Sequence, residues 1–420
     1  MNRLGAIRIV ADFIEVGETP SNPESSRVFI MRIPLDLPSP HADEQAHSEA
    51  LQQQIRAAIA TAGGHIGFDR YMELALYAPG LGYYSSGHQK FGEGGDFITA
   101  PELSPLFSRC LARQCAEVLA AIPDGEILEF GAGSGIMAAT ILGELAALDC
   151  LPRRYAILEL SSELRARQQQ TIAQHVPALL ARVEWLDALP EQGFRGVILA
   201  NEVLDAMPVQ RFCIRHGEPH ELVVGWNGQD FELLSAAPDA ALFARLERLR
   251  QQYHLSDGYH SELNLRGEQW IAALGGLLEQ GIVLLIDYGF PQSEYYHPQR
   301  SEGTLMCHYR HRAHGDALIL PGLQDITAHV DFTAIGEAAL KAGMAVRGYT
   351  NQASFLLSLG LTEYLVETGE DVRIQLELAN QVKRLTMPGE MGELFKVMAL
   401  GKGWQAPLRG FALRDDRARL

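Results

Sequence analysis

Three glycines at alternating positions are the first feature of the sequence that could support chemistry. Gly131, Gly133 and Gly135 lie in the stretch EFGAGSG, between the apolar runs EIL and IMAATIL. The pattern predicts a strand, a tight turn and a helix, which would point backbone N–H groups and a helix N-terminus at a ligand. Glycine suits such a turn because the backbone can approach a ligand without a Cβ in the way.

A carboxylate follows each of the next two predicted strands. Glu159 ends the run YAILE, and Asp187 ends RVEWLD. Glu159 could accept hydrogen bonds from both hydroxyls of a ribose, and Asp187 could accept one from an adenine amino group. Each feature alone has a simpler explanation, a tight turn or a surface acid. Their order at successive strand ends, where open α/β sheets bind ligands, favours a nucleotide-type ligand.

The details of the glycine loop distinguish between nucleotide cofactors. The dinucleotide fingerprint is GxGxxG or GxGxxA, but here its third position is Ile136 and the glycine comes one residue early. Glu129 precedes the loop, an arrangement typical of methyltransferases that use S-adenosyl-L-methionine (SAM). SAM has a ribose, a sulfonium and an amino-acid moiety but no pyrophosphate. The sequence therefore predicts SAM as the cofactor, with a Rossmann-type oxidoreductase as the alternative.

Strands and helices alternate through the middle of the chain, as in parallel βαβ units. The strands are nearly continuous apolar runs, which suit a sheet covered on both faces. We predict a helix from Ser48 and a second helix capped by Asp69. The predicted divisions of the 420 residues are an N-terminal extension (1–47), a helical cap with a cofactor loop (48–125), a core (126–208 and 281–403), an inserted substrate subdomain (209–280) and a tail (404–420).

The N-terminal extension is the least defined of these divisions. Residues 6–16 and 27–33 alternate in polarity and could pair as a hairpin, and 36–45 has the composition of a linker. In a second interpretation Met31 is the physiological start and the hairpin is an upstream extension.

Composition excludes several classes of partner. The net charge is −17, which argues against nucleic-acid binding and against docking on anionic membranes, and leaves room for a basic protein or peptide. No apolar run is long enough to span a membrane, and the first residues do not resemble a secretory signal. Five scattered cysteines without a CxxC pair fit a reducing compartment, so we expect a cytoplasmic protein.

Several longer stretches resemble one known family. They are GYYSSG, KFGEGGDFITAPELSPLF, LEFGAGSGIMAATIL, ANEVLDAMPV, GTLMCHYRHRAHGD, GLQDITAHVDF and MGELFKVMALG. From about Leu51 to about Gly403 the chain resembles the MidA-type SAM-dependent methyltransferases, which include the mitochondrial complex I assembly-factor arginine methyltransferase. The resemblance implies an α/β class I methyltransferase fold, a doubly wound seven-stranded sheet with an N-terminal helical extension and an inserted α+β subdomain.

The resemblance also gives a role to the stretch at residues 90–107. It implies that GDFITAPE lies against the cofactor pocket, opposite the glycine loop. Asp96, Thr99 and Glu102 would then supply the polar atoms that hold the methionine end of SAM. Gly94 and Gly95 would permit an unusual backbone path, and Pro101 would fix the turn. A surface Ω-loop that satisfies its own hydrogen bonds is the alternative.

The acceptor that the resemblance implies is an arginine in a protein partner, by analogy a complex I subunit. A guanidinium is a permanent cation, so its enzyme needs carboxylates to orient it and to remove a proton. ANEVLDAMP offers Glu202 and Asp205 as catalytic residues, and Asn201 as support for cofactor or substrate. In the structural alternative, Asp205 caps a turn and Glu202 pairs with a surface arginine. A SAM-binding assembly protein without robust catalysis is the alternative function.

Weaker candidates follow later in the chain. Asp287 and Tyr288 end a strand at the same rim, and DITAHVDF could line the substrate mouth with Asp325, His329 and Asp331. His329 could transfer a proton, although a structural histidine is the commoner case. Four possible zinc ligands occur in CHYRHRAH, namely Cys307, His308, His311 and His314. The interleaved arginines oppose a dication, so we predict no metal.

Overall fold

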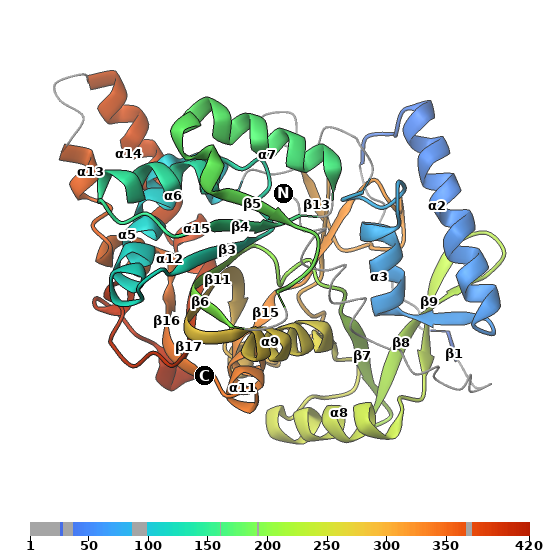
Figure 1. Ribbon diagram of the computed structural model, residues 1–420. Coiled ribbons are helices and arrows are strands. Elements are labelled where there is room, and N and C mark those ends of the chain that lie inside the picture. The colour runs from blue at the N-terminus through green and yellow to red at the C-terminus, as the bar shows by residue number, and fades with distance from the viewer. Residues whose placement is uncertain (1–25, 28–36, 86–98, 160, 191–192, 367–371) are drawn as a thin grey trace.

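The computed structural model describes residues 26–27, 37–85, 99–159, 161–190, 193–366 and 372–420. A large sheet with helices on both sides forms one part of the molecule, and a smaller sheet with its own helices forms the other (Figure 1). The predicted hairpin of residues 6–16 and 27–33 lies outside the described residues, apart from Arg27.

Seven strands form the main path of the large sheet, in the order β16-β17-β11-β6-β3-β4-β5. Their bounds are β3 Glu126–Phe130, β4 Tyr155–Leu158, β5 Val183–Leu186, β6 Phe194–Asn201, β11 Leu278–Phe290, β16 Ala345–Asn351 and β17 Phe395–Lys402. Neighbouring strands are parallel except at β17, which runs antiparallel to both β11 and β16. A short strand, β15 (Val330–Asp331), pairs with the end of β11. The predicted doubly wound seven-stranded sheet is confirmed.

Helices cover both faces of this sheet (Figure 1). On one face lie α5 (Pro105–Ala121), α6 (Ile136–Ala147) and α12 (Gln352–Ser358), and on the other α9 (Leu265–Leu277) and α11 (Phe332–Lys341). Strand β11 shows why its sequence is apolar throughout. Ile282 and Leu284 face the first group of helices, and Val283 and Leu285 face the second. All four are fully buried.

The smaller sheet joins the predicted insertion to the N-terminal part of the chain. Its order is β1-β9-β8-β7-β10, and β2 also pairs with β8. The bounds are β1 Ser26–Arg27, β2 His65–Gly67, β7 Gln210–Arg215, β8 Glu218–Trp226, β9 Phe231–Ala236 and β10 His260–Leu263. Helices α2 (Ala42–Thr61), α3 (Phe68–Tyr77) and α8 (Ala240–Tyr253) accompany this sheet (Figure 1). Two strands from before the core thus complete the sheet of residues 209–280.

Two local predictions at the N-terminal side are wrong. The linker predicted over 36–45 extends too far, because α2 begins at Ala42, where the Glu44 carboxylate accepts a hydrogen bond from the backbone N–H of His41 (2.7 Å). Asp69 does not cap the second helix. That helix begins at Phe68, two residues earlier than predicted, with Gly67 as its N-cap residue. The Asp69 carboxylate lies 3.5 Å from the guanidinium of Arg266.

Most of the remaining elements are short, and only the helices α7 and α14 are longer. The remaining elements are α4 Ala100–Leu103, α7 Ser162–His175, η1 Pro177–Arg182, α10 Gln292–Tyr295, β12 Met306–Tyr309, β13 Arg312–His314, β14 Asp325–Thr327, α13 Glu363–Val366, α14 Val372–Thr386, α15 Met391–Leu394, η2 Arg409–Phe411 and η3 Arg417–Arg419. Strands β13, β12 and β14 form a third sheet. Within the described ranges, no helix is both long enough and apolar enough to cross a membrane.

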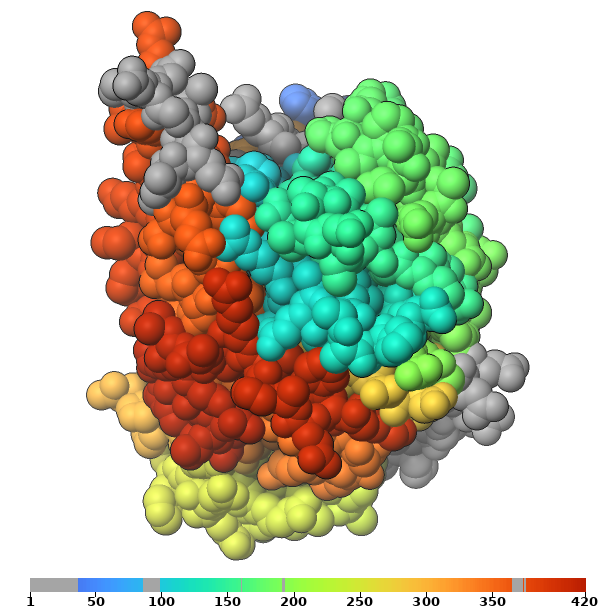
Figure 2. Space-filling view, turned by 60° about the vertical axis from the view of Figure 1, so that its left-hand side comes forward, coloured from blue at the N-terminus to red at the C-terminus, as the bar shows by residue number. Residues whose placement is uncertain are grey.

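Residues 404–420, predicted as a tail, pack against the core. Figure 2 shows these red segments beside the cyan region that contains α5 on one face. The backbone N–H of Gly410 donates to Gln114 of α5 (2.9 Å), and the ring of Phe411 lies 5.4 Å from that of Phe355. Because Leu408 and Phe411 are buried, this segment is part of the hydrophobic core.

Candidate active site

A cavity opens beside the glycine loop, at the carboxyl ends of β3 and β6. Three parts of the chain line it: the end of the GDFITAPE stretch, the loop itself and the end of β6. The lining residues are Thr99, Pro101, Glu102, Glu129, Gly131, Ala132, Gly133, Ser134, Ile136, Met137 and Asn201. The structure therefore brings together seven of the residues predicted to bind the cofactor. Gly95 and Asp96 lie outside the described residues.

The glycine loop takes the left-handed backbone conformation at all three glycines. The φ angles are +67° at Gly131, +56° at Gly133 and +87° at Gly135. A Cβ at Gly133 would meet no atom within 4 Å, so this glycine leaves open space at the cavity. A Cβ at Gly135 would lie 3.0 Å from the Cα of Gln168, so this glycine lets α7 pack closely on the loop.

Glu129 is buried completely beneath this loop. One carboxylate oxygen accepts a hydrogen bond from the Tyr155 hydroxyl (2.7 Å), and the other has no partner within the described part of the chain. Burial raises the pKa of Glu129 to about 7, and the Tyr155 hydrogen bond opposes that rise. The side-chain oxygen of Asn201 is likewise buried without a partner among the described residues. Two unsatisfied acceptors at one cavity suit a cationic donor such as the α-ammonium group of SAM.

The described end of the GDFITAPE stretch touches the glycine loop directly. The Ser134 hydroxyl donates to the Glu102 carboxylate over 2.5 Å. Pro101 lies in the first turn of α4, and Thr99 is its N-cap residue. This part of the stretch therefore lines the same cavity as the glycine loop and contacts it.

Glu159 and Asp187 lie at strand ends, in contrasting surroundings. Glu159 is completely buried, and its two carboxylate oxygens accept from the backbone N–H of Ser161 (2.9 Å) and the side-chain amide of Gln168 (3.2 Å). Asp187 is largely exposed and pairs with Arg165 at 2.6 Å. Neither residue lines the cavity at the glycine loop. The roles of these two acids toward ribose and adenine stay predictions.

The acidic loop, which we define as residues 202–207, follows β6 directly. Glu202 has a φ of +51°, a left-handed backbone conformation that is uncommon for non-glycine residues. Its backbone N–H donates to the carbonyl of Ile286 (2.8 Å). Both predicted catalytic acids are buried, with 5% exposure at Glu202 and 1% at Asp205. The Asn201 amide donates to the Glu202 carboxylate (3.2 Å), which links the acid to a residue of the cavity wall.

Asp287 holds the backbone of the acidic loop. One of its carboxylate oxygens accepts from the backbone N–H groups of Leu204 (3.0 Å) and Asp205 (3.2 Å), and the other accepts from Tyr288 (3.0 Å). Sequence analysis placed Asp287 at the rim as a weaker candidate. The structure shows that its carboxylate supports the loop that carries the stronger candidates.

Three further hydrogen bonds hold the acidic loop from distant parts of the chain. The Tyr77 hydroxyl donates to the Ala206 carbonyl (2.9 Å), and the Asn264 amide donates to the Leu204 carbonyl (2.9 Å). The backbone N–H of Ala328 donates to the Asp205 carbonyl (2.8 Å). Sequence analysis missed Tyr77 and Asn264, because nothing in their local sequence pattern indicates a partner more than 50 residues away.

The other weak candidates have visible structural roles. His329 stacks on Phe290 (ring centroids 5.3 Å apart), and burial lowers its pKa to about 4, so it is neutral near pH 7. Asp331 caps α11, and Asp325 accepts a 2.5 Å hydrogen bond from Tyr84. CHYRHRAH forms the hairpin of β12 and β13. Among the residues that the structure describes, no three His, Cys, Asp or Glu side chains are grouped to hold a metal ion.

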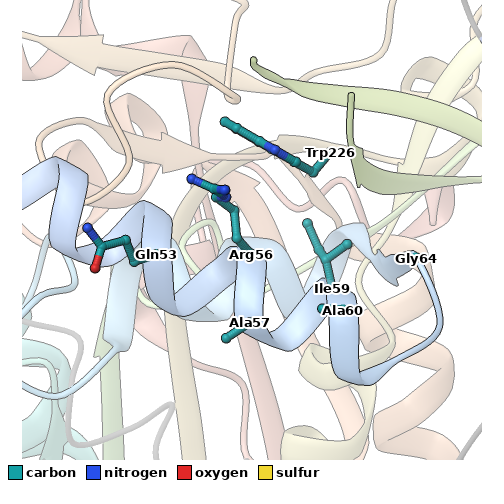
Figure 3. Close-up of a pocket in the computed structure, with 7 residues that line it drawn as sticks. All are labelled: Gln53, Arg56, Ala57, Ile59, Ala60, Gly64 and Trp226. Atoms are coloured by element: carbon teal, nitrogen blue, oxygen red, sulfur yellow. The ribbon is translucent and has the colours of Figure 1, made fainter. Parts of the chain in front are cut away.

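A second depression lies on the other part of the molecule, between α2 and Trp226 (Figure 3). Its lining includes Arg56, whose guanidinium carbon is 4.5 Å from the centroid of a Trp226 ring. None of the predicted site residues and no acid lines it. The cavity at the glycine loop is therefore the candidate active site.

Comparison with known proteins decides the family. Residues 110–350 match the profile of a family described as "Putative S-adenosyl-L-methionine-dependent methyltransferase". This chain belongs to that family. A COG1565 superfamily member from Burkholderia thailandensis, crystallised with S-adenosyl-homocysteine, is 48% identical with a TM-score of 0.88, and the match covers 92% of this chain and all of that one. A native crystal structure of a COG1565 superfamily protein from the same organism is 47% identical (TM-score 0.86, with the same coverage).

More distant relatives carry a more specific name. Protein arginine methyltransferase NDUFAF7 of rat mitochondria is 28% identical over 375 residues, with 80% of this chain and 81% of the relative covered. The mouse protein of the same name is 29% identical over 373 residues, with the same coverage.

These findings confirm a class I methyltransferase fold and SAM as the cofactor. They favour SAM over the dinucleotide alternative. The residues at the glycine loop fit this cofactor in their chemistry, since the buried, unsatisfied oxygens of Glu129 and Asn201 offer hydrogen-bond acceptors at the cavity.

Proposed function

We propose that this methyltransferase acts on the guanidinium group of an arginine in a protein partner. The support is the acidic loop beside the cofactor cavity, together with the names of the mitochondrial relatives. By analogy with the family resemblance, the proposed partner is a subunit of respiratory complex I. The proposed location is the cytoplasm, where five unpaired cysteines are stable as thiols.

The observation that carries the proposal is the build of the acidic loop. Two buried acids, Glu202 and Asp205, lie on a loop whose backbone is held at Leu204, Asp205 and Ala206. A planar guanidinium matches two carboxylates through paired N–H···O hydrogen bonds. A loop fixed in this way pre-orients both acids before an acceptor binds, which is how positioning lowers a barrier.

The division of labour follows from the chemistry of the acceptor. When bound, SAM supplies a methyl group on a sulfonium, which makes that carbon electrophilic. The two acids hold the guanidinium so that one nitrogen points at this carbon. As the new N–C bond forms, the bond between the methyl carbon and sulfur would break and leave the neutral thioether S-adenosyl-homocysteine. The nitrogen loses a proton, which a neighbouring carboxylate accepts. Exclusion of water by the buried site strengthens these charge interactions.

The test uses SAM with an isotopically labelled methyl group and a lysate of the source organism from which this gene has been deleted. Labelled protein whose digest contains methylarginine supports the proposal. The Glu202→Gln and Asp205→Asn variants should give no label while still binding S-adenosyl-homocysteine. Label on lysine or on small molecules alone would reject an arginine acceptor. Binding of S-adenosyl-homocysteine without any transfer would favour the assembly-protein alternative.

A further inference from the structure

Gln168 is a buried amide on a helix whose neighbouring glutamines are exposed. It lies on α7 with no exposed surface, whereas Gln169 and Gln170 face the solvent. Its side-chain N–H groups donate to the carbonyl of Gly133 and to the carboxylate of Glu159, both at 3.2 Å. Its side-chain oxygen accepts from the indole N–H of Trp185 at 2.8 Å. The amide is thus used as a donor and as an acceptor.

The three partners belong to three different parts of the cofactor-binding edge. Gly133 lies in the loop after β3, Glu159 follows β4 and Trp185 lies in β5. An amide can join these groups because it has two donor hydrogens and an acceptor oxygen. A glutamate at this position would lack the donor hydrogens, and an apolar side chain would lack both the donors and the acceptor. Helix α7 can place the amide there because Gly135 lets the backbone at Gln168 come close.

We propose that Gln168 is a positioning residue that sets the orientation of the Glu159 carboxylate toward the ribose of the cofactor. The Ser161 N–H and the Gln168 amide each hold one oxygen of Glu159, which fixes the plane of the carboxylate. The same amide also holds the Gly133 carbonyl, so the distance between Glu159 and the glycine loop is fixed. A bidentate contact to two hydroxyls requires such a fixed plane. This proposal rests on the SAM cofactor and on the predicted role of Glu159, and does not depend on the acceptor.

The test measures binding of two ligands by isothermal titration, S-adenosyl-homocysteine and its 2′-deoxyribose analogue. Wild type should bind the analogue about tenfold more weakly, as for the loss of one hydrogen bond to a charged group. Gln168→Met keeps the length of the side chain and removes its hydrogen bonds. In this variant S-adenosyl-homocysteine should bind about tenfold more weakly than to wild type. The affinities for the two ligands should then differ by no more than about threefold.

Matched variants separate positioning from packing. Gln170→Met, on the exposed side of the same helix, should behave as wild type. In a Glu159→Ala background, Gln168→Met should cause no further change in the ratio of the affinities for the two ligands, because the two residues act as one unit. If Gln168→Met fails to fold, Trp185→Phe removes the indole N–H together with one ring of the side chain, and should shift the ratio of the two affinities less, in the same direction. A wild-type ratio near one, or an unchanged ratio in folded Gln168→Met or Trp185→Phe, would overturn the proposal.

Discussion

The cofactor half and the acidic half of this site are built in opposite ways. The cofactor half takes its described residues from one stretch of the chain, between Thr99 and Asn201. The acidic loop begins at the end of that stretch, but its backbone is held by Tyr77, Asn264, Asp287 and Ala328. The described residues of one half thus come from one continuous stretch of the chain, and the other half depends on supports that lie outside it. If this contrast is correct, substitutions should damage the two halves separately.

Removal of charge from the acidic loop should give the largest effect. Glu202→Gln and Asp205→Asn keep the size of each side chain but remove the carboxylate that holds a guanidinium. We expect methyl transfer to fall by about 10²–10³-fold, as when one aimed electrostatic contact is lost. The affinity for S-adenosyl-homocysteine, measured by titration, should change by less than about threefold. Loss of cofactor affinity in either variant would show that the two halves are not separate.

A substitution behind the acidic loop should act on transfer alone. Asp287→Asn weakens the charged acceptor for the N–H groups of Leu204, Asp205 and Tyr288, where each such bond contributes about 1.5–3 kcal/mol. We expect transfer to fall by about 10–100-fold because the loop relaxes, with cofactor affinity little changed.

Asp331→Asn is the matched control for that variant, since Asp331 also accepts from two backbone N–H groups, at the start of α11. It should lower the melting temperature and leave transfer per folded molecule unchanged. An equal loss of transfer in both variants would mean that the Asp287 effect reports general stability.

The cofactor half can be damaged through a glycine. At Gly135 an alanine would meet both a left-handed backbone and a Cβ contact of 3.0 Å to Gln168, whereas at Gly133 it would meet only the backbone conformation. The left-handed conformation costs a non-glycine residue about 1–2 kcal/mol, and overpacking adds about 1–3 kcal/mol. Gly135→Ala should therefore lower the melting temperature more than Gly133→Ala. Its affinity for S-adenosyl-homocysteine should fall by about tenfold or more.

The same contrast explains how much the sequence could predict. The glycine loop, Glu129 and the seven strands of the large sheet are encoded in local patterns, namely glycine spacing and continuous apolar runs. The supports of the acidic loop are not. Tyr77 lies in an ordinary amphipathic helix and Asn264 looks like a helix cap, which it also is. Their hydrogen bonds to residues 204–206 form only after two sheets have packed together, and single-sequence patterns carry no information on that packing.

Two further differences between the sequence predictions and the structure also arise from long-range contacts. The smaller sheet was predicted as an insertion over 209–280, yet β1 and β2 from before the core complete it, because sheet pairing is not local. Gln168 was not singled out, since a buried glutamine and its exposed neighbours look alike in the run QQQ. Long-range partners therefore account for what sequence analysis missed in both parts of the molecule.

A further predicted effect is a pH dependence confined to the cofactor half. Burial raises the pKa of Glu129 to about 7, and the ionised carboxylate attracts the ammonium group of the cofactor more strongly than the neutral acid does. The affinity for S-adenosyl-homocysteine should therefore weaken as pH falls below 7, approaching about tenfold per pH unit. Titrations between pH 5.5 and 8 should show this for wild type and not for Glu129→Gln. Tyr155→Phe should move the transition to higher pH, because the Tyr155 hydroxyl lowers the pKa of Glu129.

The stability of the free protein should change with pH in the opposite direction. The folded pKa of Glu129 lies above its ordinary value of 4.5, so the folded state binds the proton more tightly than the unfolded state. The cost of the buried charge is therefore fully present above pH 7 and is relieved as pH falls from 7 toward 4.5. Relative to Glu129→Gln, wild type should gain stability over this window while it loses cofactor affinity. Changes of the same sign in stability and affinity would mean that another group titrates, since a single buried carboxylate that binds a cation requires opposite signs.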